Sequence, residues 1–151
     1  MRMESLHHEL TPKLLESLYV EAMVLADEAR FYFDRDQMAV NFSPEISVAF
    51  SCESLKVTTR LMHSIAWLLN QKALLAGEIS HYDSLTDARD LGYSPASDSY
   101  QVDRFPEEAR TLIAASEDLY FRLQRMSQKM RSAEKPMPEP LAMIERLRAS
   151  F

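Results

Sequence analysis

The fold of this chain is decided by residues 44–77, PEISVAFSCESLKVTTRLMHSIAWLLNQKALLAG. Ser43 is a good helix N-cap, Pro44 suits the first helical position, and no glycine or further proline follows until Gly77. The stretch therefore predicts one uninterrupted helix over about 44–76. At about 1.5 Å per residue this helix is roughly 50 Å long. A compact sphere of this chain length has a radius of gyration of about 15 Å, so the molecule should be elongated.

Two further helices are predicted around this one. Thr11 and Pro12 begin a helix over about 12–35, and Phe105 precedes a helix over about 106–131. In both, apolar or small residues recur at alternating spacings of three and four, which is typical of packed helices. The two seams are Leu15, Leu18, Ala22, Leu25, Ala29 and Tyr32, then Ala109, Leu112, Ser116, Leu119, Leu123, Met126 and Met130. We predict an all-α fold, an elongated three-helix bundle domain spanning residues 1–131.

A long connection and a tail complete the chain. Residues 78–104 are polar and predict an extended connection between the second and third helices, whose order the sequence leaves open. Three prolines within 132–140, SAEKPMPEP, favour an extended linker. Beyond it, apolar side chains at helical spacing allow a short amphipathic helix, which we expect to be either disordered or docked on another surface: Leu141, Ile144 and Leu147. We therefore treat 132–151 as a flexible tail.

Composition excludes several classes of protein. The formal charge of −6 and the pI near 5.2 argue against a nucleic-acid or anionic-membrane partner. Only two glycines are present, so phosphate-cradling loops and dinucleotide-binding turns are not expected. Cys52 is the single cysteine, which rules out an intrachain disulfide. The N-terminus lacks the apolar region of a signal peptide, and we expect a soluble, cytoplasmic protein without a cofactor.

No residue pattern predicts catalysis. Two Glu-x-x-His pairs occur, at residues 4–7 and 78–81, but both fall outside the predicted helices, so we expect no metal site. Cys52 and His63 are separated by about three helical turns, or roughly 16 Å, and cannot form a nucleophile–base pair. We predict no catalytic residues, no metal and no cofactor.

The central helix carries two apolar stripes. The first contains Phe50, Val57, Leu61, Ile65 or Ser64, Leu68 and Leu75. The second contains Leu55, Met62, Ala66, Leu69 and Ala73. Two stripes indicate that the helix is covered on more than one side. A lone three-helix bundle leaves one side of each helix in water, so the spare apolar surface predicts contact with another chain.

A Thr-Thr-Arg triplet, Thr58 to Arg60, lies where this spare apolar surface begins. Threonine hydroxyls in a helix can bond the carbonyl four residues back, and Arg60 can reach an acidic neighbour such as Glu53 or a residue across the bundle. The triplet is thus either a polar layer that fixes helix register or part of an interface. Trp67 is either a core residue or an interface anchor. The candidate interface or polar-layer residues are Thr58, Thr59, Arg60, Met62, Trp67 and Leu69, and the candidate tail contacts are Leu141, Ile144 and Leu147.

A family resemblance follows from the same helix. Its segment Glu53-Ser54-Leu55-x-Val57-Thr58-Thr59-Arg60-Leu61-Met62, followed by Ala66-Trp67-Leu68-Leu69-x-Gln71-Lys72-Ala73 and Gly77-Glu78, resembles the signature of the RcdA family, regulators of CtrA degradation in alphaproteobacteria. The later Glu117-Asp118-Leu119-Tyr120-x-Arg122-Leu123 is similar to that family's third helix. The resemblance spans the three predicted helices.

The resemblance implies a dimeric three-helix bundle that acts as an adaptor for the ClpXP protease. In the family's best-known setting it works with a receiver-domain adaptor, CpdR, and a cyclic-di-GMP-binding adaptor, PopA, to deliver the cell-cycle regulator CtrA, with localisation at a cell pole. It implies no catalytic residues. Two other classes stay open from the residues alone: a helical DNA-binding regulator, and an enzyme with a metal in the bundle core.

Overall fold

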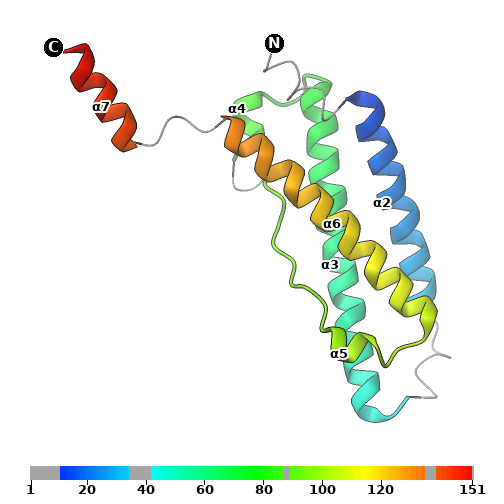
Figure 1. Cartoon of the computed structure of the whole chain (residues 1–151). Helices are drawn as coiled ribbons and strands as arrows, with labels where there is room; N and C mark the ends of the chain where they lie inside the picture. Colours follow the sequence, from blue (N-terminus) through cyan, green and yellow to red (C-terminus); the bar gives the residue numbers. More distant parts are fainter. Residues whose placement is uncertain (1–10, 35–41, 87–88, 135–138, 151) are drawn as a thin grey trace.

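The computed structural model describes residues 11–34, 42–86, 89–134 and 139–150 (Figure 1). The described residues form helices and loops, with no strand. The helices are α2 (Pro12–Phe33), α3 (Pro44–Leu75), α4 (His81–Ser84), α5 (Ser99–Val102), α6 (Glu107–Glu134) and α7 (Glu139–Ala149). The three long helices α2, α3 and α6 lie side by side as an elongated bundle, which confirms the all-α prediction (Figure 1).

The starts of α2 and α3 follow from their capping residues. The hydroxyl of Thr11 accepts a hydrogen bond from the Leu14 amide at 3.1 Å, and the hydroxyl of Ser43 accepts one from the Ile46 amide at 3.3 Å. Each cap satisfies an amide that has no partner within the helix. Both helices therefore begin at the predicted residue.

The end of α3 depends on one glycine. Gly77 has φ of 75°, a left-handed conformation that costs a glycine little. There the amides of Gly77 and Glu78 bond back to the carbonyls of Leu74 and Ala73, at 3.1 and 2.9 Å. This is the Schellman arrangement, and it ends the helix one residue before the predicted boundary.

The predicted seams form the core. All six seam residues of α2 are buried, as are the first five of the seven on α6, and Met126 and Met130 pack against them partly buried. The inner stripe of α3 is buried from Phe50 to Leu68 with Ser64, not Ile65, at the middle position. Leu75 was wrongly placed in this stripe. It is the last residue of α3, at the end of the bundle, and its side chain is 52% exposed.

The linker prediction was wrong at both ends of 132–140, and its middle part, 135–138, lies outside the described residues. Residues 132–134 continue α6, and α7 already begins at Glu139. A proline constrains the residue before it, and Pro136 leaves 132–134 free to stay helical. Pro140 lies in the first turn of α7, where a proline is tolerated.

None of the described helices has both the length and the apolar character needed to cross a membrane.

Candidate functional site

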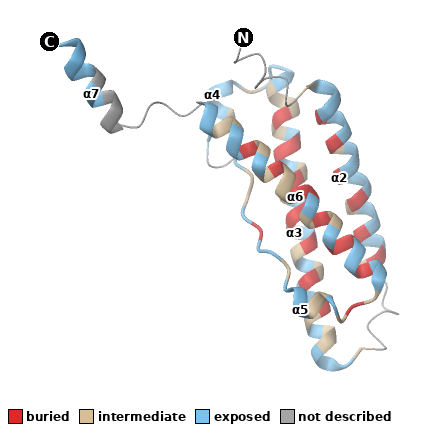
Figure 2. Cartoon of the chain, in the orientation of Figure 1, coloured by how far each residue is buried: buried red, intermediate tan, exposed pale blue. Residues whose placement is uncertain are grey.

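The long helix α3 presents two opposite faces, and both are unusual. Its inner face is buried against α2 and α6 and includes four polar residues among the apolar ones (Figure 2). The buried residues are Phe50, Glu53, Val57, Arg60, Leu61, Ser64, Trp67, Leu68 and Gln71. Its outer face carries large apolar side chains in water: Val48, Leu55, Met62 and Leu69, exposed by 65, 66, 65 and 46%.

The outer face of α3 also lacks charge over its central part. Between Val57 and Gln71 the only formally charged residue is Arg60, and Arg60 is fully buried on the other side of the helix. An outer helix face normally carries charged residues in this position. Apolar side chains on such an uncharged face are typical of a surface that another molecule covers.

The outer face of α2 is different. It also exposes apolar side chains, Val20, Val24 and Phe31, by 50, 50 and 66%. Yet Asp27 and Arg30 lie on the same helix, both largely exposed, and pair with each other at 3.6 Å. Charges between the apolar residues make this face an ordinary solvated one.

Thr58 and Thr59 satisfy their own hydroxyls. Thr58 donates to the carbonyl of Ser54 at 3.0 Å, and Thr59 donates to the carbonyl of Leu55 at 2.9 Å. These are the bonds to the residue four positions back that the sequence predicts. Each hydroxyl is therefore already bonded on the helix surface, and the pair adds little polarity to the outer face.

Arg60 forms a polar layer through the middle of the bundle. Its guanidinium donates to the Ser116 hydroxyl on α6 at 3.2 Å, the Pro95 carbonyl at 3.0 Å and the Ser97 hydroxyl at 2.7 Å. Its own carbonyl accepts from the Ser64 hydroxyl at 2.7 Å. Arg60 thus joins α3, α6 and the connection between α4 and α5 at one point.

The charge of Arg60 is buried without a direct carboxylate partner among the described residues. Burial lowers the pKa of Arg60, and the nearby carboxylates of Glu117 and Glu53 oppose that change. An arginine stays protonated at neutral pH even so. Of the two partners that the sequence offered, Glu53 therefore interacts with Arg60 only at longer range. A residue across the bundle, Ser116, bonds the guanidinium together with the neutral oxygens of Pro95 and Ser97.

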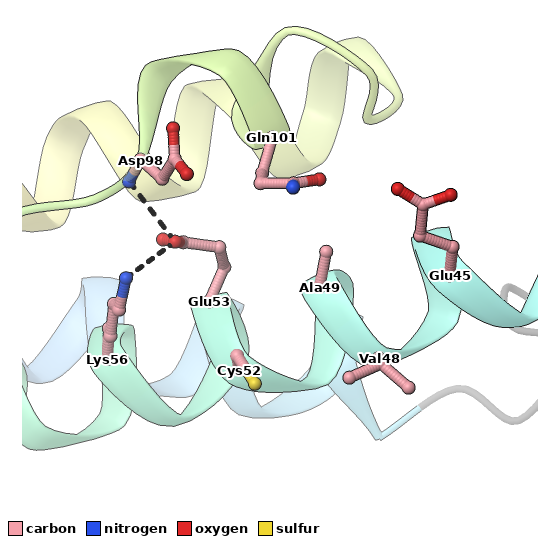
Figure 3. Close-up of a pocket in the computed structure, with 8 residues that line it drawn as sticks. All are labelled: Glu45, Val48, Ala49, Cys52, Glu53, Lys56, Asp98 and Gln101. Carbon is pink, nitrogen blue, oxygen red and sulfur yellow. Dashed lines mark hydrogen bonds and ion pairs between the residues drawn. The ribbon is translucent and has the colours of Figure 1, made fainter.

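Glu53 lies one level below Arg60 and is itself only 2% exposed. One carboxylate oxygen accepts from the Lys56 ammonium at 2.9 Å and from the Asp98 amide at 3.3 Å (Figure 3). Burial alone would raise the pKa of Glu53, but hydrogen bonds from Ser97, Lys56 and the Asp98 backbone together lower it below the ordinary value. Glu53 is therefore ionised at neutral pH and holds α5 onto α3.

Residues 89–98, here called the strap, run along the bundle from α4 to α5 (Figure 1). The Ser94 hydroxyl lies 3.0 Å from Nδ1 of His63, and the Ser94 amide donates to the Tyr120 hydroxyl at 3.0 Å. Tyr120 in turn donates to the Gly92 carbonyl at 2.7 Å. The strap is thus held by side chains of α3 and α6, largely through its backbone.

The beginning of the strap is held in the same manner. Arg89 donates to Asn70 at 3.0 Å, and Asp90 forms an ion pair with Arg131 at 3.0 Å. The strap is therefore bonded to α3 and α6 at its beginning, in its middle and near its end, so residues 89–98 have a defined path along the bundle. The sequence had left open whether the 78–104 connection follows such a path.

A shallow groove lies beside the outer face, between α3 and α5 (Figure 3). Its lining residues are Glu45, Val48, Ala49, Cys52, Glu53, Lys56, Asp98 and Gln101. Val48, Ala49 and Cys52 supply the apolar part of its lining, and Glu45, Glu53, Lys56 and Asp98 supply charged groups at its edges. Such a hollow can accept an apolar side chain from another helix.

The tail helix α7 presents a second uncovered apolar surface. Met143, Ile144 and Leu147 are exposed by 58, 46 and 57%. Figure 1 shows α7 apart from the three long helices. The amphipathic helix predicted for the tail is present, whereas the side chain of Leu141 lies outside the described part of the chain.

The predicted site residues separate into two groups. Met62 and Leu69 belong to the outer face, which Thr58 and Thr59 flank, Thr58 exposed and Thr59 half-buried. Arg60 is fully buried and Trp67 is 3% exposed. Of the two alternatives for Trp67, core residue or interface anchor, the structure supports the core residue, because its side chain already packs inside the bundle.

Sequence reasoning missed the partners of Arg60, since Pro95 and Ser97 are distant in the chain. One signal was available: Ser116 occupies a core position of the α6 seam, and a buried hydroxyl needs a partner.

The side chains that could take part in catalysis or metal binding do not form a common site among the described residues. Cys52 is exposed, whereas His63 bonds Ser94, and no cluster of metal-binding side chains occurs within the described ranges. The Glu-x-x-His pair at residues 4–7 lies outside them.

These features define an all-α bundle protein with a strapped polar layer and an uncharged outer helix face. Residues 6–151 match a family model described as "Protein of unknown function (DUF1465)". The chain belongs to this family, which is the family of RcdA. The crystal structure of RcdA from Caulobacter crescentus is similar to it, with a TM-score of 0.62 and 27% sequence identity over 78% of this chain and 90% of that one. No curated protein matches the sequence.

Proposed function

We propose that this protein is a non-enzymatic adaptor in regulated proteolysis, as the similarity to RcdA supports. It acts as a homodimer in the cytoplasm and helps to deliver substrates, among them a CtrA-like cell-cycle response regulator, to the ClpXP protease. Its further partners are a CpdR-like receiver adaptor and a PopA-like cyclic-di-GMP adaptor at a cell pole. Nucleic acid and membrane are not among its ligands.

The observation that carries this proposal is the uncharged outer face of α3 on a chain of this family. Val48, Leu55 and Met62 are each about two-thirds exposed, and no described element of the chain covers them. Apolar surface of this kind gains free energy when a protein partner removes it from water. Glu53 and Arg60, which an enzyme could use, instead hold the strap in place.

The tail supplies a second contact. We propose that residues 132–151 form a tethered segment whose helix α7 binds a partner through Ile144 and Leu147, both exposed, together with Leu141. A weak tail contact and a weak bundle contact on one chain act together, because the first raises the effective concentration of the second.

The test is a delivery assay with the host's own protease. The full chain should capture the protease or its adaptors from host lysate and accelerate degradation of a CtrA-like substrate. A variant that ends at Glu134 should keep the unfolding transition of the bundle but deliver substrate more slowly. If the full chain neither captured the protease or its adaptors nor accelerated degradation, the adaptor role would be contradicted. Unchanged delivery by the truncated chain would reject only the role of the tail.

A further inference from the structure

The outer face of α3 has a size pattern in addition to its apolar character. Its residues follow each other at alternating spacings of four and three, the spacing of a seam between two helices. They are Val48, Cys52, Leu55, Thr59, Met62, Ala66, Leu69 and Ala73. On the helix this seam lies opposite the buried face that contacts α2 and α6.

The seam complements itself when one copy is reversed. If two α3 helices cross in opposite directions at a point between Arg60 and Leu61, each seam residue meets its counterpart from the other end. The four facing pairs are Val48 with Ala73, Cys52 with Leu69, Leu55 with Ala66 and Thr59 with Met62. Every pair joins a larger side chain to a smaller one, which is how facing layers fill space evenly.

A parallel arrangement does not have this property. Each residue would then face its own copy, so that Leu55 meets Leu55 and Ala66 meets Ala66. Large side chains would crowd some layers, and small ones would leave gaps in others, and both defects cost stability.

We propose that a second copy of this chain packs on the outer face of α3, with the two α3 helices antiparallel about a two-fold axis near residues 60 and 61. The inference rests on the homodimer of the proposed function and adds its surface, direction and register. An isologous contact needs a self-complementary surface, and this face has the required size pattern. The eight seam residues themselves are uncharged, and the charged groups of Lys56 and of Arg89, which bonds Asn70, lie beside the seam.

The groove between α3 and α5 supports the register. Val48, Ala49 and Cys52 form the apolar part of its lining, and the two-fold axis brings Leu69 of the second copy to the level of Cys52. Leu69 is a large side chain that is 46% exposed in the single chain. In the dimer it fills the hollow of the second copy as a knob in a hole.

The arrangement also places the tails. The end of α6 from which the chain continues into α7 lies near the end of α3 (Figure 1). Because the two α3 helices are antiparallel and each is roughly 50 Å long, the two α7 helices leave the dimer at opposite ends. The dimer is then a two-ended scaffold that offers a tail on each side.

Disulfide trapping tests the pairing, since Cys52 is the only cysteine of the chain. The wild-type chain supplies Cys52, and a Cys52→Ser, Leu69→Cys double variant supplies only the second position. With copper–phenanthroline as oxidant, a mixture of the two should give disulfide-linked dimers, because facing seam residues meet the distance that a disulfide needs. Either chain alone should stay uncrosslinked, since Cys52 of one copy lies roughly 25 Å along the helix from Cys52 of the other.

The controls separate this arrangement from its rivals. A Cys52→Ser, Val20→Cys variant places the thiol on the outer face of α2 and should not crosslink to the wild type. Disulfide dimers of the wild type alone would show a parallel dimer and overturn the proposal. A dimer by light scattering without the mixed crosslink overturns the register but leaves the adaptor function, whereas a monomer at high concentration overturns the dimer itself. The delivery assay then decides the adaptor function independently.

Discussion

At the scale of single residues, the structure explains why an arginine occupies the core of a small bundle. The strap contributes little apolar surface, since Ser94 is its only buried residue, Tyr93 is 80% exposed and only Leu91 packs against the core, partly buried. Apolar packing alone therefore does little to hold the strap. Arg60 has several donors in a fixed plane, and one such side chain can bind a carbonyl and two hydroxyls from different segments at once. The burial of the charge is the cost of ordering a loop that has little apolar surface of its own.

Replacing Arg60 with methionine should therefore destabilise the bundle and free the strap. The Pro95 carbonyl and the Ser97 hydroxyl would lose their donor, and Glu53 would lose a nearby cation. We expect a loss of about 2–3 kcal/mol in the free energy of unfolding, measured in urea. Hydrogen exchange at the Ser94 and Asp98 amides should become faster as well.

The matched control is Arg110→Met, which removes an exposed arginine from the same bundle. It should change the free energy of unfolding by less than about 0.5 kcal/mol. Equal stability of the two variants would show that the bonds of Arg60 contribute nothing net.

Glu53 gives the bundle a pH dependence of known sign. Its folded pKa is lowered below the ordinary 4.5, so its ionised form stabilises the fold above that value. This contribution is lost as the pH falls from 4.5 through the folded pKa. Glu53→Gln should cost about 1–2 kcal/mol of unfolding free energy at pH 7, and the difference from wild type should shrink as the pH falls below that window. A difference that stays constant with pH would reject this role of Glu53. The control is Glu108→Gln, which changes an exposed residue on α6.

At the scale of helices and loops, local signals were enough for the long elements. Thr11, Ser43 and Gly77 act only on adjacent turns, so their roles could be read from the sequence. The six-residue seam of α2 was predicted completely because a regular spacing has one buried face.

The strap could not be predicted, because its structure depends on contacts between residues far apart in the chain. Ser94 bonds side chains 31 and 26 positions away, and Ser97 bonds one 37 positions away. No local spacing encodes such pairs. For the same reason the sequence identified Arg60 as a candidate without identifying what it binds.

The fit of the strap against α3 can be tested at Gly92. A Cβ added there would lie 2.7 Å from the ring of His63, closer than side chains approach. Gly92→Ala should therefore displace the strap, with a loss of about 1–3 kcal/mol in unfolding free energy and faster exchange of the Ser94 amide.

A double-mutant cycle separates this clash from a general effect of alanine. His63→Ala removes the ring, so Gly92→Ala should cost much less in that background. Equal costs in both backgrounds would mean that the His63 ring does not limit this position.

At the scale of the whole molecule, polar and apolar residues on α3 have separate tasks. Polar groups on the inner face, chiefly Glu53 and Arg60, hold α5 and the strap to the bundle. The strap covers one flank of α3, and the outer seam is left free. In the single chain the core is therefore fully packed, whereas the outer seam of α3 stays exposed to water. Assembly through this seam should add stability without changing the fold.

Assembly of this kind makes stability depend on concentration. The melting temperature of the wild type should rise with protein concentration, because the native state is the species that associates.

Met62 lies next to the two-fold axis, so Met62→Glu brings two carboxylates together and should give a monomer whose melting temperature is independent of concentration. Met62 is 65% exposed in the single chain, hence the far-ultraviolet circular dichroism of the variant should match that of the wild type. Val20→Glu, on the charged outer face of α2, should leave the dimer intact. A wild-type melting temperature that does not vary with concentration, or a Met62→Glu variant that stays dimeric, would mean that the α3 seam is not where two copies meet.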